Sequence, residues 1–513
     1  MNTTRSHARL AFVLAIASSL VLAGCSASPT PEDTAAEPHA TELVVAESVA
    51  PKTFDPIMSD VVATWYPWAL AYETLVTATE SGEILPALAE TWSLSDDGLT
   101  YTFVLREGVT FHNGDTFDSG DVVASFTRLL NDAVPYVTSR FAALKEVRAT
   151  DEKTVEFVLS QRDAGFLTNL GDPYAVGSAI LSETALQSGD PATEMIGTGP
   201  YKMVAYKPDQ ELDLEAFDGY WGDAPANETL RIVYLPEQSA QTAALRNGQI
   251  DVMFPTAESA RTLTGGQIKL ESILGGTVSQ LEINVDKNPA LADVRVRNAI
   301  ALSIDRKAIV DNALLGEGAP SAQIPASLGI APDLATLPNY SRDLDAAKKL
   351  LADAGFADGI DLSLLTYGTA SEAQKRWVEV VQSQLAESGI RVTIESLDFA
   401  AWLERFNGGD FELLANFTSY KADPLWYVKI RPGRHGATPT ALEGVEGKIL
   451  SAPSQEEYIS LIQDYQVQQA TLSWPNISLA AEQARVAYGP GVTDASTPPV
   501  SMTRTFLFHI KTN

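Results

Sequence analysis

The chain has 513 residues, of which 45% are hydrophobic and 20% are charged, with a single cysteine and a formal net charge of -30. This length predicts more than one domain, and the composition is typical of a folded globular protein rather than a disordered or polytopic membrane protein. Because 36 Lys and Arg residues stand against 66 Asp and Glu residues, an extended basic surface is excluded and nucleic acid is not an expected partner. We interpret the acidic excess as a solvated surface.

The first 24 residues have the pattern of a secretion signal. Arg5 and Arg9 precede an apolar run over residues 10–22, which is shorter than the roughly 20 residues that a membrane-spanning helix needs. The run ends in Leu-Ala-Gly-Cys at residues 22–25, which resembles the lipobox of bacterial lipoproteins and makes Cys25 the predicted lipidation site. An ordinary cleaved signal peptide with an incidental cysteine is the alternative. Since Cys25 is the only cysteine, no intramolecular disulfide is expected.

Residues 25–40 are predicted to form the lipid anchor and a flexible tether. The segment after the cysteine is rich in Ser, Pro, Ala and Glu and has no apolar periodicity. No later segment approaches 18 consecutive apolar residues, so we expect a folded body that lies outside the membrane.

The pattern of apolar residues predicts a mixed α/β body. Alternation predicts strands over residues 42–46, 101–106 and 154–159. Helical spacing predicts two helices, one over 344–351 and one over 371–388, and glycines at 355 and 389 mark their ends. A predicted strand follows each helix, at 362–365 and at 390–395. Two successive helix–strand units favour a sheet covered by helices.

Ten sequence blocks keep a fixed order along the chain and read FDP at 54–56, YETLV at 72–76, LPALAETW at 85–92, DGLTYTF at 97–103, LREGV at 105–109, FHNGD at 111–115, GTGPY at 197–201, YWG at 220–222, NGQIDV at 247–252 and VRVRNA at 294–299. Together these blocks resemble the family 5 solute-binding proteins of bacterial ABC transporters, which bind oligopeptides, dipeptides, nickel chelates and opines. Many of these residues are turn formers that indicate the fold rather than the ligand. We therefore interpret His112 as a packed turn histidine and not as a metal ligand.

The resemblance implies an α/β, two-lobe periplasmic-binding-protein fold of class II, in its three-domain variant, with the ligand buried between the lobes. It places lobe one at 41–77, 200–275 and 491–513, an inserted smaller domain at 78–199, and lobe two at 276–490. Open and closed forms would exchange, and the ligand would contact both lobes only in the closed form. The expected protein is a monomer without a cofactor that serves an ABC permease and separate ATPase subunits.

The sequence offers little support for an enzyme. Outside the signal and tether the histidines are His112, His435 and His509, and no His-x-x-x-His, Gly-x-Ser-x-Gly or Gly-x-x-x-x-Gly-Lys pattern occurs. The cysteine is assigned to the lipid, so no thiol nucleophile is expected. A secreted hydrolase is the alternative, and ATP hydrolysis is assigned to another subunit.

Three ligand-site candidates come from one motif of the family. Relatives that hold a peptide α-amine place an Asp four residues before the Pro of a motif that reads YKADP at 420–424 here, so Tyr420 takes that position. Asp423 would substitute for the missing Asp after a small register shift. Nickel-chelate relatives carry a His about a dozen residues further on, and His435 matches it within one residue. Their Arg in the inserted domain has no clear counterpart at 169–174, so a metal held through a chelate is an alternative.

The remaining candidates are basic and aromatic. Arg431 and Arg434 flank a Gly-Pro loop, and a guanidinium suits bidentate pairing with a ligand carboxylate, although a solvated loop is the alternative. Trp65 and Tyr66 precede the block at 72, where family members offer aromatic side chains, with core packing as the alternative. Further candidates are Trp402, Trp426, Tyr427 and, in the inserted domain, Arg140.

The function that the sequence predicts is a substrate-binding lipoprotein of an ABC importer that takes up peptides or a peptide-like ligand. Its expected location is outside the cytoplasm, at the periplasmic space or cell surface, anchored to the bacterial cell membrane through Cys25. A receptor for a nickel chelate or an opine is an alternative, and so is a surface receptor that senses peptides.

Overall fold

A computed structural model describes residues 41–59, 65–263, 265, 267–429, 434–499 and 501–512 of the chain. The predicted signal, Cys25, the tether and Arg431 lie outside these residues. Within the described ranges, no helix has the length and apolar character needed to cross a membrane. The same ranges contain no group of three or more His, Cys, Asp or Glu side chains that could hold a metal ion.

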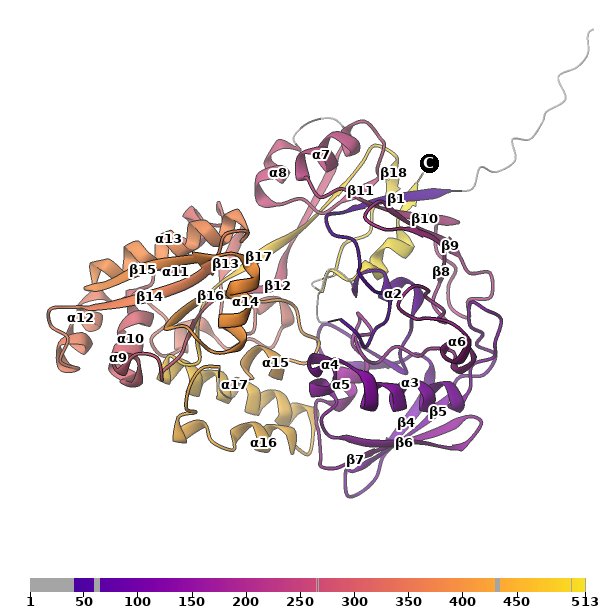
Figure 1. Ribbon diagram of the computed structural model, residues 1–513, viewed down its shortest axis with the longest axis horizontal. Coiled ribbons are helices and arrows are strands. Elements are labelled where there is room, and N and C mark those ends of the chain that lie inside the picture. The colour runs from indigo at the N-terminus through magenta and orange to yellow at the C-terminus, as the bar shows by residue number, and fades with distance from the viewer. Residues whose placement is uncertain are drawn as a thin grey trace, which may run out of the picture. The chain divides into compact units, whose positions relative to one another are not determined.

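The largest sheet has 11 strands in the order β15-β14-β16-β12-β17-β11-β1-β10-β9-β8, with β13 paired to β17 (Figure 1). Strand β1, inside this sheet, is buried along most of its length and pairs in parallel with β10 and β11. The strands are β1 (Glu42–Glu47), β8 (Tyr201–Lys207), β9 (Glu211–Ala216), β10 (Thr229–Tyr234), β11 (Val252–Met253), β12 (Lys269–Ile283), β13 (Gly318–Pro320), β14 (Ile360–Tyr367), β15 (Ile390–Leu397), β16 (Leu413–Thr418) and β17 (Asn476–Tyr488).

Two long antiparallel strands, β12 and β17, join the two lobes (Figure 1). The first lobe contains β1 to β11, and the second lobe contains β13 to β16. At one end β17 pairs with β11 of the first lobe, and at the other end β12 pairs with β16 of the second lobe. The β12–β17 register is interrupted between Leu274 and Val278, a stretch that includes Gly275 and Gly276. An irregular ladder with two adjacent glycines is where such a strand bends with least resistance.

The first lobe also carries a separate four-stranded sheet, β4-β5-β7-β6, and a small hairpin, β2–β3. Its longest helix, α3, begins with a capping box. The Asp118 side chain accepts from the backbone N–H of Asp121, and the Asp121 side chain accepts from the backbone N–H of Asp118. The elements are β2 (Val76–Ala78), β3 (Ile84–Pro86), β4 (Ala89–Leu94), β5 (Thr100–Leu105), β6 (Leu144–Asp151), β7 (Thr154–Leu159), α2 (Trp68–Ala71), α3 (Ser119–Asp132), α4 (Pro135–Arg140), α5 (Phe166–Leu170), α6 (Glu183–Ser188), α7 (Gln238–Arg246), α8 (Ala257–Thr262), η4 (Arg504–His509), β18 (Val492–Asp494) and β19 (Lys511–Thr512).

The second lobe contains most of the helices in the second half of the chain. They are α9 (Pro289–Ala292), α10 (Val294–Ser303), α11 (Arg306–Asn312), α12 (Leu344–Asp353), α13 (Glu372–Glu387), α14 (Phe399–Asn407), α15 (Leu425–Val428), α16 (Val445–Leu450), α17 (Gln455–Leu472), η1 (Ala326–Leu328), η2 (Leu334–Thr336) and η3 (Thr440–Leu442). The predicted helix–strand units are confirmed as α12–β14 and α13–β15, and their two strands pair in parallel. Ser371 caps α13, and Gly389 ends it with a φ of 95°, a conformation that favours glycine.

The three predicted strands of the first lobe are confirmed as β1, β5 and β7. The alternating apolar residues lie on one buried face of the strand. In β5, for example, Tyr101, Phe103 and Leu105 are all buried. His112 is a packed turn residue, as interpreted from the sequence. Its Nε2 lies 2.9 Å from the carbonyl oxygen of Gly199, and burial lowers its pKa.

The two lobes touch through the segment around α5. The backbone N–H of Ala164 donates to the carbonyl of Leu450 at 2.9 Å, and Asn169 donates to the carboxylate of Asp423 at 3.1 Å. A Cβ on Gly165 would lie 2.6 Å from Asp423 Oδ2 and 2.7 Å from the Tyr458 hydroxyl. Glycine is therefore what allows this close approach of the first lobe to the second.

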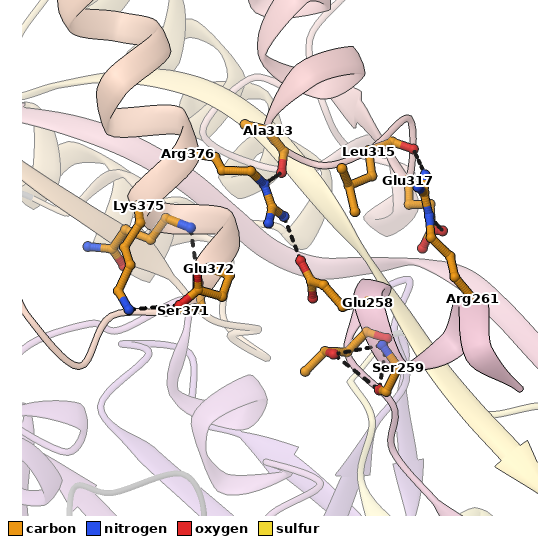
Figure 2. Close-up of polar contacts among 12 residues, drawn as sticks. Glu258, Ser259, Arg261, Ala313, Leu315, Glu317, Ser371, Glu372, Lys375 and Arg376 are labelled. Atoms are coloured by element: carbon orange, nitrogen blue, oxygen red, sulfur yellow. Dashed lines mark hydrogen bonds and ion pairs between the residues drawn. The ribbon is translucent and has the colours of Figure 1, made fainter. Parts of the chain in front are cut away.

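A second contact between the lobes lies beside the β12–β17 pair (Figure 2). Glu258 of α8 accepts from Arg376 of α13 at 2.7 Å, and Arg376 also donates to the carbonyl of Ala313. Arg261 of α8 donates to the carbonyl of Leu315 at 2.7 Å. These bonds hold the first lobe's α8 against the second lobe near the strands that join them.

Replacing Gly165 by Ala should push the lobes apart at the α5 contact, because the new methyl group would overlap Asp423 and Tyr458. We expect a larger radius of gyration in small-angle scattering. Gly447→Ala is the matched control, since Gly447 lies in α16 with no atom within 4 Å of an added Cβ. Identical scattering for Gly165→Ala and wild type would contradict the contact.

Replacing Asp163 by Asn should make the stability of the protein less dependent on pH. Burial and the nearby charge of Asp423 raise the pKa of Asp163 to about 7. An acid whose folded pKa is raised stabilises the fold fully below its unfolded pKa of 3.8, and this stability is lost as pH rises toward 7. Asn keeps the acceptor for Gly165 N–H. The advantage of Asp163→Asn in free energy of unfolding, measured by denaturant titration, should grow between pH 4.5 and pH 8 by about 1 to 2 kcal/mol. A difference that does not change with pH would refute this.

Candidate functional site

Six aromatic side chains from both lobes form one cluster, which we call the aromatic cluster. Its members are Trp65, Tyr66, Tyr136, Tyr174, Tyr420 and Trp426. The Trp65 and Tyr136 rings are stacked, with 5.9 Å between centroids and 12° between planes. Tyr174 bridges the lobes, because its ring lies 5.8 Å from Trp65 and 6.5 Å from Tyr420. Four of the sequence candidates thus come together here.

The ammonium group of Lys421 lies beside this cluster. Its Nζ is 5.9 Å from the Trp65 ring centroid and 5.6 Å from the Tyr136 centroid. It donates to the Tyr136 hydroxyl at 3.3 Å and to the Ser419 hydroxyl at 3.5 Å. Burial by itself would raise the pKa of Tyr136, but the charges of Lys421 and Arg140 outweigh that effect and lower it. In the part of the chain that the structure describes, no carboxylate pairs with Lys421.

Arg140, the basic candidate of the inserted domain, is buried and already paired. Its guanidinium forms an ion pair with Asp172, and both side chains are almost fully enclosed. The other oxygen of Asp172 accepts from the backbone N–H of Tyr174 at 2.7 Å. Arg140 therefore fastens α4, which carries Tyr136, to the loop that carries Tyr174.

Asp423, the candidate for an amine anchor, has both oxygens engaged by protein donors. Oδ1 accepts from the Tyr458 hydroxyl at 2.6 Å and from Leu425 N–H at 3.0 Å, while Oδ2 accepts from Asn169. The side chain is buried, and burial raises its pKa despite these bonds. Asp423 thus connects the second lobe to α5 of the first lobe.

A cavity of about 360 Å³ lies next to the aromatic cluster, with walls from both lobes. Tyr420 closes it from the second lobe, and the C-terminal segment forms another wall, where Ser501 N–H donates to Glu80 at 2.8 Å. The lining residues are Ala69, Tyr72, Glu73, Thr74, Thr77, Ala78, Thr79, Glu80, Ala87, Asp172, Pro173, Ala175, Pro200, Tyr220, Tyr420, Pro499, Ser501, Thr503, Thr505 and Phe508. Hydroxyl and carboxyl groups dominate its polar surface, which suits a ligand rich in hydrogen-bond donors.

Glu73 is the most perturbed acid of the cavity. It accepts from the Trp221 indole and the Thr198 hydroxyl, both at 2.8 Å, and from the Tyr220 hydroxyl at 3.2 Å. Burial raises the pKa of Glu73 to about 7, against these hydrogen bonds. Sequence reasoning included Glu73 in a family block but did not single it out.

Arg434 and His435 lie away from the aromatic cluster, inside the second lobe. Both contact Glu282 of β12: His435 Nε2 at 3.0 Å and Arg434 Nη2 at 3.2 Å. Asn416 also donates to Glu282 at 2.7 Å, and the Arg434 guanidinium lies 3.4 Å from the Phe406 ring centroid. Burial by itself would raise the pKa of Glu282. The contacts with Arg434 and His435 outweigh that effect and hold the pKa well below the usual range. In this structure the two basic candidates contact a buried acid of the protein itself.

The two remaining aromatic candidates have structural surroundings. Trp402 of α14 stacks on Phe406 at 4.7 Å and packs against Tyr367, in a cluster separate from that of Trp65. Tyr427 donates to the carbonyl of Gly276 at 2.7 Å and accepts from the backbone N–H of Lys421. Tyr427 thereby ties the Lys421 backbone to the irregular stretch of β12.

Sequence reasoning missed Tyr136, Tyr174 and Lys421. Tyr136 and Tyr174 lie outside every family block, and only the fold brings them to Trp65. Lys421 stands in the motif at 420–424, directly after the Tyr that replaces the expected Asp. The sequence signal that could have pointed to Lys421 is its position beside Tyr420, where the family's Asp is missing.

The chain is similar to known proteins over most of its length. The family model of bacterial extracellular solute-binding proteins, family 5 Middle, matches residues 83–429. A dipeptide-binding protein of Escherichia coli is 30% identical over 76% of this chain and 78% of its own length. Heme-binding protein A of Haemophilus influenzae is 31% identical over 79% of this chain and 80% of its own length.

Solved structures agree with these sequence matches. The ABC transporter-associated periplasmic binding protein DppA of Helicobacter pylori, in complex with peptide STSA, has a TM-score of 0.76 and 25% identity over 92% of this chain and 98% of its own. NikA of Brucella suis, in complex with Fe(III)-EDTA, has a TM-score of 0.80 over 92% and 100% of the two chains, and at 23% identity it supports the fold alone. The predicted two-lobe fold is thus confirmed. The chain belongs to the bacterial extracellular solute-binding proteins of family 5, which capture solutes for ABC importers.

Proposed function

We propose that this protein captures peptides or a peptide-like ligand between its lobes and delivers it to the permease of an ABC importer. The observation that carries the proposal is the cavity of about 360 Å³, whose walls come from both lobes and adjoin the aromatic cluster. A ligand that contacts both lobes binds best when they are closed, so binding shifts the population toward the closed form.

The chemistry of the cavity agrees with a peptide. Its hydroxyl and carboxyl groups accept hydrogen bonds from amide and ammonium groups, and its aromatic neighbours supply apolar contact for side chains. A relative that is 30% identical is a dipeptide-binding protein, which supports the same ligand class. A chelate held through His435 is less well supported, because Glu282 already occupies its Nε2.

The proposal includes an anchored, extracytoplasmic protein. The lipobox-like sequence at 22–25 supports lipidation of Cys25, with residues 25–40 as a tether to the bacterial cell membrane. We also keep the proposed domain boundaries, with the inserted domain at 78–199 and lobe two at 276–490. The register interruption between Leu274 and Val278 supports the boundary near 275. We propose that the protein acts as a monomer and catalyses no reaction itself.

A bulky side chain inside the cavity should block the ligand. Thr77 lies on β2, is exposed, and lines the cavity. Thr77→Trp should therefore lower affinity for a co-purified or library peptide at least about tenfold, with little change in melting temperature. Native mass spectrometry would identify the ligand, and calorimetry would measure its affinity.

Thr393→Trp is the matched control, because Thr393 is exposed on β15 of the second lobe and should leave affinity unchanged. Wild-type affinity in Thr77→Trp would place the ligand elsewhere. If only heme or a nickel chelate co-purifies and no peptide raises the melting temperature by mass action, the peptide proposal is wrong.

Replacing Cys25 by Ala should release the protein from the membrane fraction, because the thiol that would carry the lipid is removed. The folded body should keep its melting temperature, since Cys25 lies in the predicted tether and no core contact is expected there. Ser26→Ala is the control and should remain membrane-bound. A Cys25→Ala protein that still sediments with membranes would refute lipidation at this residue.

A further inference from the structure

Among the residues that the structure describes, no carboxylate pairs with the ammonium group of Lys421. Its ammonium group is half-buried, and the partners that the structure gives it are the hydroxyls of Tyr136 and Ser419 and the faces of two aromatic rings. Removing a cation from water costs free energy unless a group of opposite charge pairs with it. Nine of the chain's 15 lysines form ion pairs with acids among the described residues, and Lys421 is not one of them.

The neighbouring Lys429 provides the comparison. Its Nζ lies 4.2 Å from the Trp426 ring centroid, so it borders the same aromatic cluster. Its charge, however, opposes the rise in pKa that burial causes at two acids, Asp163 and Asp423. Neither lysine forms an ion pair among the described residues, but the charge of Lys429 favours ionisation of these two acids, whereas the charge of Lys421 acts on the Tyr136 hydroxyl.

The surroundings of Lys421 are also fixed in position. Tyr427 holds the Lys421 backbone N–H, and Tyr427 is itself bonded to Gly276 in the stretch that joins the lobes. Tyr136 comes from the first lobe, so its hydroxyl meets Lys421 only when the lobes are together. Since a phenol both accepts and donates, a hydroxyl that accepts from Lys421 keeps its own proton to donate to a ligand.

We propose that the Lys421 ammonium and the Tyr136 hydroxyl form an anion subsite that takes a carboxylate of the ligand. This rests on the proposed function and deepens it: the charged group that the ligand presents beside Tyr420 is an anion, not an ammonium. For a peptide this group is its C-terminal carboxylate or an acidic side chain. The bonds to the carboxylate are charge-assisted and form fully only when both lobes contribute.

Three peptide probes test the proposal by calorimetry: trialanine, its N-acetyl derivative and its C-terminal amide. Wild-type protein should bind the first two with similar affinity and the amide at least about tenfold more weakly, because only the amide lacks the carboxylate. Lys421→Met should bind trialanine and the amide equally, whereas Lys429→Met should keep the preference. Tyr136→Phe should reduce the preference without removing it.

The proposal is overturned if wild type binds the amide as tightly as trialanine, or if Lys429→Met loses the preference as fully as Lys421→Met. If wild type binds none of the three probes, the peptide proposal fails, and the subsite is judged by itself. Lysine methyl groups labelled with carbon-13 would then be followed by NMR. A saturable shift of the Lys421 signal with acetate, and none with acetamide, supports the anion subsite, and no shift with acetate overturns it.

Discussion

The antiparallel pair of β12 and β17 is the constraint on which the rest of the structure depends. These strands belong to both lobes, so the second lobe is positioned against the first through them. Gly276 lies in their irregular stretch, and a Cβ there would lie 2.9 Å from Tyr420. The Gly276 carbonyl accepts from Tyr427, which in turn accepts from Lys421 N–H. The strand pair that permits bending therefore also fixes the residues that face the first lobe.

The buried acids of this protein have two kinds of surroundings. Arg140 with Asp172 and Arg434 with Glu282 are enclosed pairs in which opposite charges meet directly, and His435 contacts the same Glu282 carboxylate. Such groups contribute little net stability, but removal of one partner would leave an uncompensated charge inside the protein. Asp163 and Asp423 differ, because two acids of opposite lobes approach each other and burial raises the pKa of both. The contact between the lobes at this point is thereby coupled to the protonation of Asp163 and Asp423.

The arginine–histidine loop shows why residue type alone cannot assign a ligand site. Guanidinium and imidazole groups near a family motif suit a carboxylate or a chelated metal equally well by their chemistry. The carboxylate that Arg434 and His435 contact belongs to the protein itself, on β12, about 150 residues away in sequence. Nothing in the local sequence around residue 435 identifies that partner, whereas the folded sheet places β12 beside β16 and the loop that follows.

The sequence by itself determined the elements with local causes. Alternation in β1, β5 and β7, helical spacing in α12 and α13, and the glycine after α13 are all readable because each depends on neighbours within a few residues. The ordered motifs likewise determined the family and its two-lobe fold, and the aromatic candidates Trp65, Tyr66, Tyr420 and Trp426 were found from them.

Only the tertiary structure decided which candidates meet. Trp65 reaches Tyr136 and Tyr174 across about 70 to 110 residues of chain, and Lys421 reaches Tyr136 from the other lobe. Such contacts depend on packing between distant segments, and no local pattern in the sequence encodes them.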